Sequence, residues 1–236
     1  MMIATYSEWN SPDYYWDFSN YCYLNFSEAI NFADAPIQNV LNDSSLVGYW
    51  DMNVGSGDIM PDLSGNGNNG IIYGASWVDG KFGKALSFDG QNNYVEIPYN
   101  SSLDNFQAIT ISFWMYPTMW GDGYYRHVID KGWQTEGALL VYLDRSSQNL
   151  NFVTRDSVGQ KLSSFMLPSL NTWYFVTCVF QKGLPNKIYV NATKGKDSSA
   201  TANESLILEN GIRVAQNTND FAGHHRRNLH LQPCFS

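Results

Sequence analysis

The chain has 236 residues, a length that supports one substantial hydrophobic core plus an appendage and argues against two large domains. Aromatic and charged residues each make up 15%, and there are 19 glycines, a composition that favours many short strands and tight turns over helices. The net charge of -8 argues against nucleic-acid binding, which needs clustered Lys and Arg, but it is compatible with calcium or neutral sugars.

The first 44 residues are rich in aromatic side chains but have no sustained strand or helix periodicity. We interpret residues 1–44 as an N-terminal accessory segment, or the end of a preceding region, and residues 45–236 as the main domain. The start shows no basic stretch followed by an apolar run, and nowhere are there about 18 consecutive apolar residues. No membrane span is therefore expected.

From Leu46 onward, short apolar runs alternate with clusters of Gly, Asn and Asp, which is typical of a β-sandwich. In the run after Ala108, apolar residues at odd positions alternate with more polar ones, and Pro117 ends the pattern because proline cannot donate to a strand ladder. The predicted strands cover residues 46–51, 69–74, 85–90, 93–98, 109–117, 127–132, 139–144, 150–155, 173–181, 187–192 and 212–217.

Four segments carry a resemblance to a known family: DLSGNGNNG from Asp62, WVDGKFGKALSFDGQNNYVEIP from Trp77, TWYFVTCVF from Thr172 and KIYVNATKGK from Lys187. They resemble the laminin-G-like jelly-roll domains of the concanavalin A-like lectin/glucanase superfamily. The resemblance covers about residues 46–223. It implies an all-β jelly-roll sandwich of two antiparallel sheets, with a short irregular N-terminal segment, in an extracellular or cell-surface protein that binds glycans or mediates adhesion.

Two positions depart from the family pattern. Ala192 stands in a turn where the family usually has glycine. The tail from His224 to Ser236 is atypical, but permitted codons for residues 224–236, read one base later, encode Ile-Ile-Asp-Glu-Ile-Tyr-Ile-Tyr-Asn-Arg-Ala-Leu. This alternate-frame sequence is close to the closing strand of the family, so we hypothesise a frameshift, natural or from sequencing.

The family places its closing strand beside the first strand, here residues 46–51. In that position Asn228 and His230 would point inward, whereas a slip of one residue would turn Leu229 and Leu231 inward instead. The tail histidines match no zinc spacing, and we therefore reject a metal site there.

The loop that follows Pro61 offers hard oxygen ligands suited to calcium, with Asp62, Asn66 and Asn68 as ligands and Asp89 as a second contributor. Asn-Gly pairs also adopt positive φ readily, so the same residues could simply form consecutive turns. The turn interpretation is the favoured one, and Ca²⁺ stays a candidate cofactor.

Aromatic residues cluster beside glycines in the loop after Pro117, where flat ring faces could bind a sugar. The alternative is that these rings fold back on the sandwich. The predicted ligand-binding residues are Trp120, Tyr124, Tyr125 and Trp133.

Catalysis is not expected. Retaining glucanases need two carboxyl groups about 5 to 5.5 Å apart, commonly from a Glu-x-Asp-x-Glu strand, and no such triplet exists. Glu204 and Glu209 have an odd offset that would place them on opposite faces of a strand. We predict a non-catalytic extracellular lectin-like module that binds a glycan or surface polysaccharide, with calcium as its candidate aid. The alternatives are an adhesion or structural module that binds other surface proteins, and a glycoside hydrolase.

Overall fold

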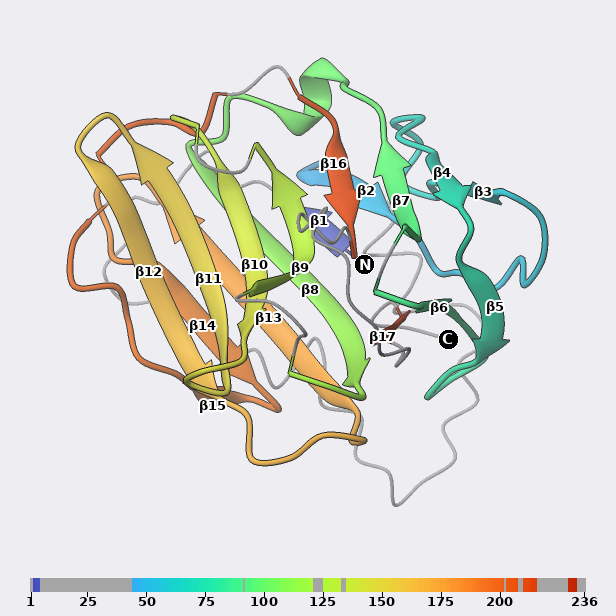
Figure 1. Ribbon diagram of the computed structural model, residues 1–236. Helices are drawn as coiled ribbons and strands as arrows, with labels where there is room; N and C mark the ends of the chain where they lie inside the picture. Colours follow the sequence, from blue (N-terminus) through green and yellow to red (C-terminus); the bar gives the residue numbers. More distant parts are fainter. Residues whose placement is uncertain are drawn as a thin grey trace, which may run out of the picture.

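Two antiparallel β-sheets lie face to face in the computed structural model of the chain (Figure 1). The structure describes residues 2–4, 44–90, 92–120, 125–132, 135–201, 203–207, 210–215 and 229–232. Within these ranges the helical element is a single short 3-10 turn, η1 (Ser101–Leu103), and no helix is long and apolar enough to cross a membrane. The predicted all-β jelly-roll sandwich is therefore confirmed.

Sheet A and sheet B each combine strands that are distant in sequence. Sheet A has the order β15 (Thr193–Lys194), β14 (Lys187–Val190), β13 (Tyr174–Gln181), β8 (Ala108–Pro117), β17 (Leu229–Gln232), β6 (Lys84–Phe88) and β5 (Ser76–Asp79), with β1 (Met2–Ala4) beside β8 and β2 (Leu46–Tyr49) beside β1. Sheet B has the order β12 (Gly159–Met166), β11 (Asn149–Asp156), β10 (Leu139–Asp144), β9 (Tyr125–Lys131), β16 (Ile212–Val214), β7 (Tyr94–Ile97), β4 (Gly70–Tyr73) and β3 (Ile59–Met60).

Every strand predicted from the apolar runs overlaps an observed strand, whereas β5, β12 and the short strands β1, β3 and β15 were missed. β12 has the sequence GQKLSSFM and exposes Leu162 and Met166 at the edge of sheet B. The alternation of β12 is not visible in its apolar residues, because the buried side chains in its first half are those of Lys161 and Ser163. A pattern search based on apolar residues cannot detect a strand of this kind.

The core lies between the two sheets, and β8 shows how it is built. Ile109, Ile111, Phe113 and Met115 are buried, as their alternation predicted, and they pack in one cluster with residues of both sheets. Cys178, on the neighbouring β13, is fully buried in the same cluster, and this burial raises the pKa of its thiol.

The position predicted for the closing strand is wrong. β17 pairs with β8 on one side and with β6 on the other, while the place beside β2 is taken by β1. The register pairs Leu231 with Met115 and Leu86, and His230 with Tyr116 and Ser87.

The proposed division of the chain at residue 44 stays a prediction. β1 belongs to sheet A although it precedes that boundary, and residues 5–43 lie outside the described residues. Most of the tail, including His224 and His225, also lies outside them. The frameshift stays a hypothesis.

Candidate functional site

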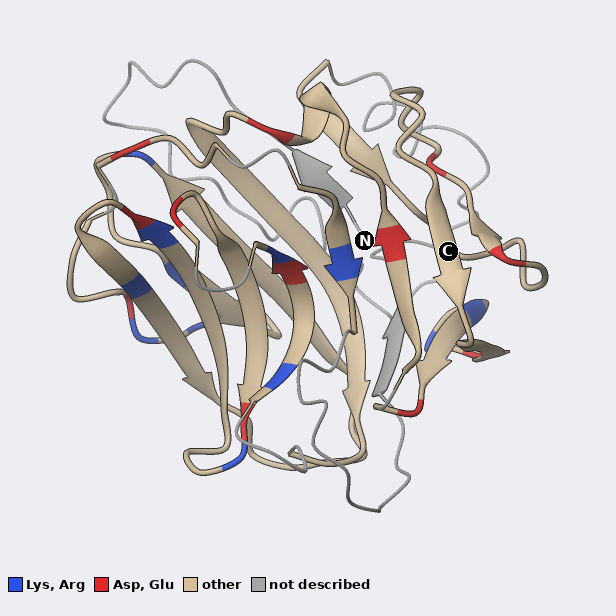
Figure 2. Cartoon of the chain, turned by 45° about the horizontal axis from the view of Figure 1, so that its top comes forward, with Lys and Arg blue, Asp and Glu red and all other residues tan. Residues whose placement is uncertain are grey.

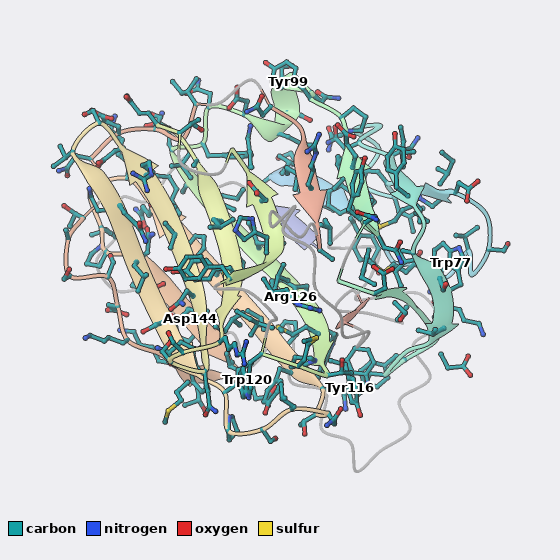
Figure 3. The ribbon with its side chains drawn as sticks, in the orientation of Figure 1. Trp77, Tyr99, Tyr116, Trp120, Arg126 and Asp144 are labelled. Atoms are coloured by element: carbon teal, nitrogen blue, oxygen red, sulfur yellow. The ribbon has the colours of Figure 1, made fainter. Side chains whose placement is uncertain are left out.

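The predicted aromatic surface is only partly described. Tyr125 begins β9 with 37% of its surface exposed, whereas Trp120 is half-buried and packs against the main core. Figure 3 shows Trp120 at the end of the sandwich opposite Tyr99. Tyr124 and Trp133 lie outside the described residues. The position of Trp120 therefore agrees with the alternative that the rings fold back on the sandwich. Of the two predicted rings that the structure describes, Tyr125 is the more exposed.

Tyr125 marks one edge of a polar and aromatic outer face of sheet B. Its ring meets that of Tyr142 edge-on, with centroids 4.8 Å apart and an interplanar angle of 69°. Burial is the main cause that raises the pKa of Tyr142 to about 12, and the neighbouring Tyr125 and Asp144 raise it further. A hydrogen bond with Asn151 acts in the opposite direction and lowers the pKa. The Tyr142 hydroxyl therefore stays protonated at neutral pH.

A buried histidine–aspartate pair continues this face on β9. His127 Nδ1 lies 2.8 Å from Asp130 Oδ2, and the side chain of His127 is fully buried. On a regular strand, side chains three residues apart would point to opposite faces. The ladder between β9 and β10 shifts register between Val141 and Tyr142, and this irregularity brings the side chains of His127 and Asp130 to the same outer face. Such a pair can orient an imidazole, but its cross-strand neighbour is Tyr142, a poor nucleophile at neutral pH because its pKa is raised.

The exposed part of the same face lies on β4, β7 and β16. The rings of Tyr73 and Tyr94 stack with centroids 4.7 Å apart at 20°, and the Arg213 guanidinium carbon lies 5.6 Å from the Tyr94 ring centroid. Arg213 Nη2 also lies 3.9 Å from Glu96 Oε1, and 40% of Tyr73 is exposed. These four residues form what we call the tyrosine platform.

Charges alternate across the platform. The register places Arg213 opposite Asp130 on one side and opposite Glu96 on the other, so a base lies between two acids on β9, β16 and β7. Figure 2 shows this red, blue and red alternation on neighbouring strands. Sequence reasoning missed the platform because β7 and β16 are far apart in sequence.

A second aromatic group covers part of the outer face of sheet A. The Trp114 ring lies 5.3 Å from that of Phe175 and 5.8 Å from that of Phe82, and Lys81 Nζ lies 4.9 Å from the Trp114 ring centroid. All three rings are half-buried. This group is more apolar than the tyrosine platform and has a cation at its edge.

The Asp62 carboxylate accepts four hydrogen bonds from the chain itself. Asp62 Oδ1 accepts from the backbone N–H groups of Tyr49 and Ser64, both at 2.9 Å, while Oδ2 accepts from the Ser64 hydroxyl and the Asn68 N–H, also at 2.9 Å. The Asn66 amide donates to the Leu46 carbonyl at 2.8 Å. Because a carboxylate offers about four acceptor positions, calcium would have to displace these donors.

The second amide predicted as a calcium ligand, that of Asn68, also makes hydrogen bonds within the chain. Asn68, 2% exposed, donates from Nδ2 to the Val47 carbonyl at 2.7 Å and to the Ser102 hydroxyl at 3.0 Å. The backbone carbonyl of Asn68 accepts from the Trp50 indole N–H at 2.8 Å. These bonds fix the loop against β2 and η1, which supports the turn interpretation.

The second predicted calcium contributor, Asp89, is followed by a glycine that packs on a cation. Gly90 has a φ of +73°, and a Cβ there would lie 2.5 Å from both Nη atoms of Arg126, so the close approach requires glycine. Arg126 is 3% exposed, and its Nη2 donates to Met119 Sδ at 3.1 Å. Across the described residues, no group of three or more His, Cys, Asp or Glu side chains is arranged to hold a metal ion.

One shallow groove is lined by two acidic residues, Glu136 and Glu204, together with Lys182. Hydrogen bonds from the Ser157 hydroxyl and backbone N–H hold the pKa of Glu204 below its usual range. A glycosidase acid needs the opposite shift. Glu209 lies outside the described residues.

Comparison with known proteins agrees with this architecture. The model of a laminin-G family described as the concanavalin A-like lectin/glucanases superfamily matches residues 89–223, more than half of the chain. The chain belongs to this family. The match begins at residue 89 and does not include the Asp62 loop. Among curated proteins, none has a significantly similar sequence.

Solved structures share the fold at low identity. The binding domain of Paraclostridial Mosquitocidal Protein 1 is 19% identical, with a TM-score of 0.59 over 75% of this chain and 46% of that one. The botulinum neurotoxin serotype D ligand-binding domain in complex with N-acetylneuraminic acid is 14% identical, with a TM-score of 0.58 over 74% and 43%. The chain thus spans less than half the length of these toxin domains.

A third similar structure is close to this chain in size. Domain 4 of AbnA, an extracellular arabinanase from Geobacillus stearothermophilus, in complex with arabinotriose, is 14% identical, with a TM-score of 0.51 over 79% of this chain and 91% of that one. At these identities the similarity establishes the fold.

Proposed function

We propose that the chain is a non-catalytic carbohydrate-binding module that holds glycan on the outer face of sheet B. The observation that carries the proposal is the tyrosine platform, a stack of two tyrosine rings and a guanidinium that is open to solvent at Tyr73. Tyr125, from the predicted surface, extends the same face on β9.

The chemistry of the platform matches that of a sugar. An aromatic ring covers the apolar C–H face of a sugar, and its polar edge stays in water. Arg213 and Glu96, 3.9 Å apart, offer donors and acceptors for the hydroxyl groups around that ring. Ligand orientation in such sites comes from a few polar groups beside a larger apolar surface.

The comparisons guide the choice of ligands. One similar structure contains arabinotriose and another N-acetylneuraminic acid, so arabinans and sialylated glycans are the first to test. Membership in the family supports a location outside the cell as part of this proposal. The platform has no need of a metal, which separates glycan binding from the calcium question.

The test is retention of the protein by immobilised polysaccharides, followed by titration with the oligosaccharide that is retained. Tyr73→Ala is expected to weaken binding about tenfold, or about 1.4 kcal/mol, because it removes the exposed ring. Tyr116→Ala is the control, since Tyr116 is a half-buried tyrosine of β8 in sheet A, on the other sheet from the platform. Equal affinity of Tyr73→Ala and the unaltered chain for a bound glycan would remove the platform from the proposal.

A second candidate function is adhesion to a protein. The aromatic group of Phe82, Trp114 and Phe175 on sheet A favours it, because half-exposed rings flanked by a cation are typical of protein interfaces. Trp114→Ala should leave glycan retention unchanged but weaken binding to a protein partner. A drop in glycan retention in Trp114→Ala would instead move the glycan site to sheet A.

A further inference from the structure

The cation of the tyrosine platform lies between two acids of the same sheet (Figure 2). Arg213 Nη2 is 3.9 Å from Glu96 Oε1, and the register places Arg213 opposite Asp130 on the other side. The guanidinium carbon also lies 5.6 Å from the Tyr94 ring centroid, and the ring face attracts the cation. Arg213 therefore has anionic and aromatic neighbours within the chain before any ligand arrives.

The two acids differ in what a ligand can reach. Asp130 is buried, and its Oδ2 lies 2.8 Å from His127 Nδ1. The side chains of Arg213 and Glu96, by contrast, are 44% and 32% exposed. A ligand that approaches Arg213 therefore meets the Glu96 carboxylate at the same time.

The surface on the other side of Glu96 is apolar. The register places Ile71 of β4 opposite Glu96 and Ile59 of β3 opposite Ile71, and directly opposed side chains share one face of a sheet. Ile59 is 50% exposed. A charged group of a ligand that lay over these isoleucines would lose water without gaining a partner.

A sugar hydroxyl suits the Arg213–Glu96 pair better than a sugar carboxylate does. A hydroxyl can accept from the guanidinium and donate to the Glu96 carboxylate, whereas an ionised carboxylate only accepts. An acidic sugar would thus bring its own charge beside that of Glu96, and like charges placed together disfavour a ligand. The net charge of -8 adds repulsion over longer distances.

We propose that the tyrosine platform selects uncharged glycans and rejects acidic ones, and that Glu96 is its specificity-determining residue. This inference rests on the proposed function, because it concerns the same surface. Glu96 acts by pairing with Arg213 and by repelling a carboxylate of the ligand. Of the two glycan classes chosen above for testing, the platform selects arabinans over sialylated glycans.

The test measures the Kd of uncharged and acidic probes. The probes are arabinotriose and two pairs that differ in charge, lactose with sialyllactose and methyl-esterified galacturonan with its de-esterified form. At least one uncharged probe should bind, each acidic probe should bind at least about tenfold more weakly, and raising the salt about tenfold should change the Kd of the uncharged probe less than about twofold. An acidic probe that binds as tightly as the best uncharged one would overturn the selectivity but leave the platform as a glycan site. Binding of no probe would overturn the proposed function as well.

A charge-removing variant tests the role of Glu96. Glu96→Gln keeps the size of the side chain, and the affinity for acidic probes relative to the best uncharged probe should rise about tenfold, with the gain reduced by salt. Asp79→Asn is the matched control, because it removes the same charge from an exposed ion pair on sheet A and should leave the ratio unchanged. No rise in Glu96→Gln, or an equal rise in both variants, would overturn the role given to Glu96.

Discussion

Ala192 is a residue in a conformation that its side chain disfavours. In the turn between β14 and β15, Asn191 has a φ of 49° and Ala192 a φ of 63°, both in the left-handed region. Asparagine tolerates this region, but for alanine the Cβ approaches the carbonyl oxygen and raises the energy. The turn thus keeps the geometry for which the family uses glycine, despite the substitution noted in the sequence.

Ala192→Gly is therefore expected to stabilise the protein. Removal of the Cβ relieves the strain and should raise the free energy of unfolding by about 1 kcal/mol, less the extra freedom of glycine in the unfolded chain. Urea unfolding would measure the change. Ala108→Gly, in β8 and without positive φ, should be destabilising, and a loss of stability in both variants would contradict the strain argument.

Asp62 illustrates the opposite case, in which one side chain satisfies many backbone groups. Asp62→Asn replaces one acceptor oxygen by an NH₂ group, so two of its four donors lose their acceptor, at a cost of about 1 to 3 kcal/mol. Thermal unfolding with calcium and with a chelator should give the same midpoint for the unaltered chain and a lower one for the variant. Asp51→Asn, which affects only bonds with Asn53, should change the midpoint less. A calcium-dependent rise that disappears in Asp62→Asn would establish a metal site.

At the scale of the element, the β11–β12 hairpin is held by a buried ion pair. Lys161 Nζ lies 2.7 Å from Asp156 Oδ1, and their side chains are 5% and 1% exposed. The other Asp156 oxygen accepts from the Asn203 N–H at 3.2 Å, which ties the segment before β16 to the hairpin. Asn186, fully buried, joins the same end through Thr154 Oγ1 and the Lys161 carbonyl.

Asp156→Ala is expected to destabilise the chain by about 3 to 5 kcal/mol, because it leaves the buried Lys161 ammonium without its carboxylate. The double variant with Lys161→Met should recover much of the loss in urea unfolding. Asp79→Ala, which breaks the exposed pair with Lys84, should change little. Additive losses in the double variant would contradict the role given to the pair.

The same pair predicts a dependence on pH. Burial raises the pKa of Asp156, but hydrogen bonds from Lys161 and from the Asn203 and Gly159 N–H groups outweigh it and leave the pKa below the usual 3.8. The folded state therefore binds this proton less readily than the unfolded state. The contribution of Asp156 to stability is present above pH 3.8 and is lost as the pH falls through the folded-state value.

At the scale of the whole molecule, the two sheets differ in the character of their outer faces. The outer face of sheet B combines tyrosines with alternating charges, whereas that of sheet A has the more apolar group around Trp114. Because the faces lie on opposite sides of one core, variants of each can be tested without disturbing the other.

The sequence by itself determined the fold class and most strands. Alternation along one strand needs only neighbouring residues, which is why the pattern of β8 and the family motifs after Asp89 were readable. A strand without an apolar pattern, such as β12, was missed for the same reason.

Only the tertiary structure decided which distant strands became neighbours. Tyr94 meets Arg213, and β1 meets both β2 and β8, through pairings between segments far apart in the chain. Local periodicity shows which face of a strand is apolar, but it contains no information about the strand's partners. The candidate site depends on those partners, because it arises from register between strands that the sequence does not place side by side.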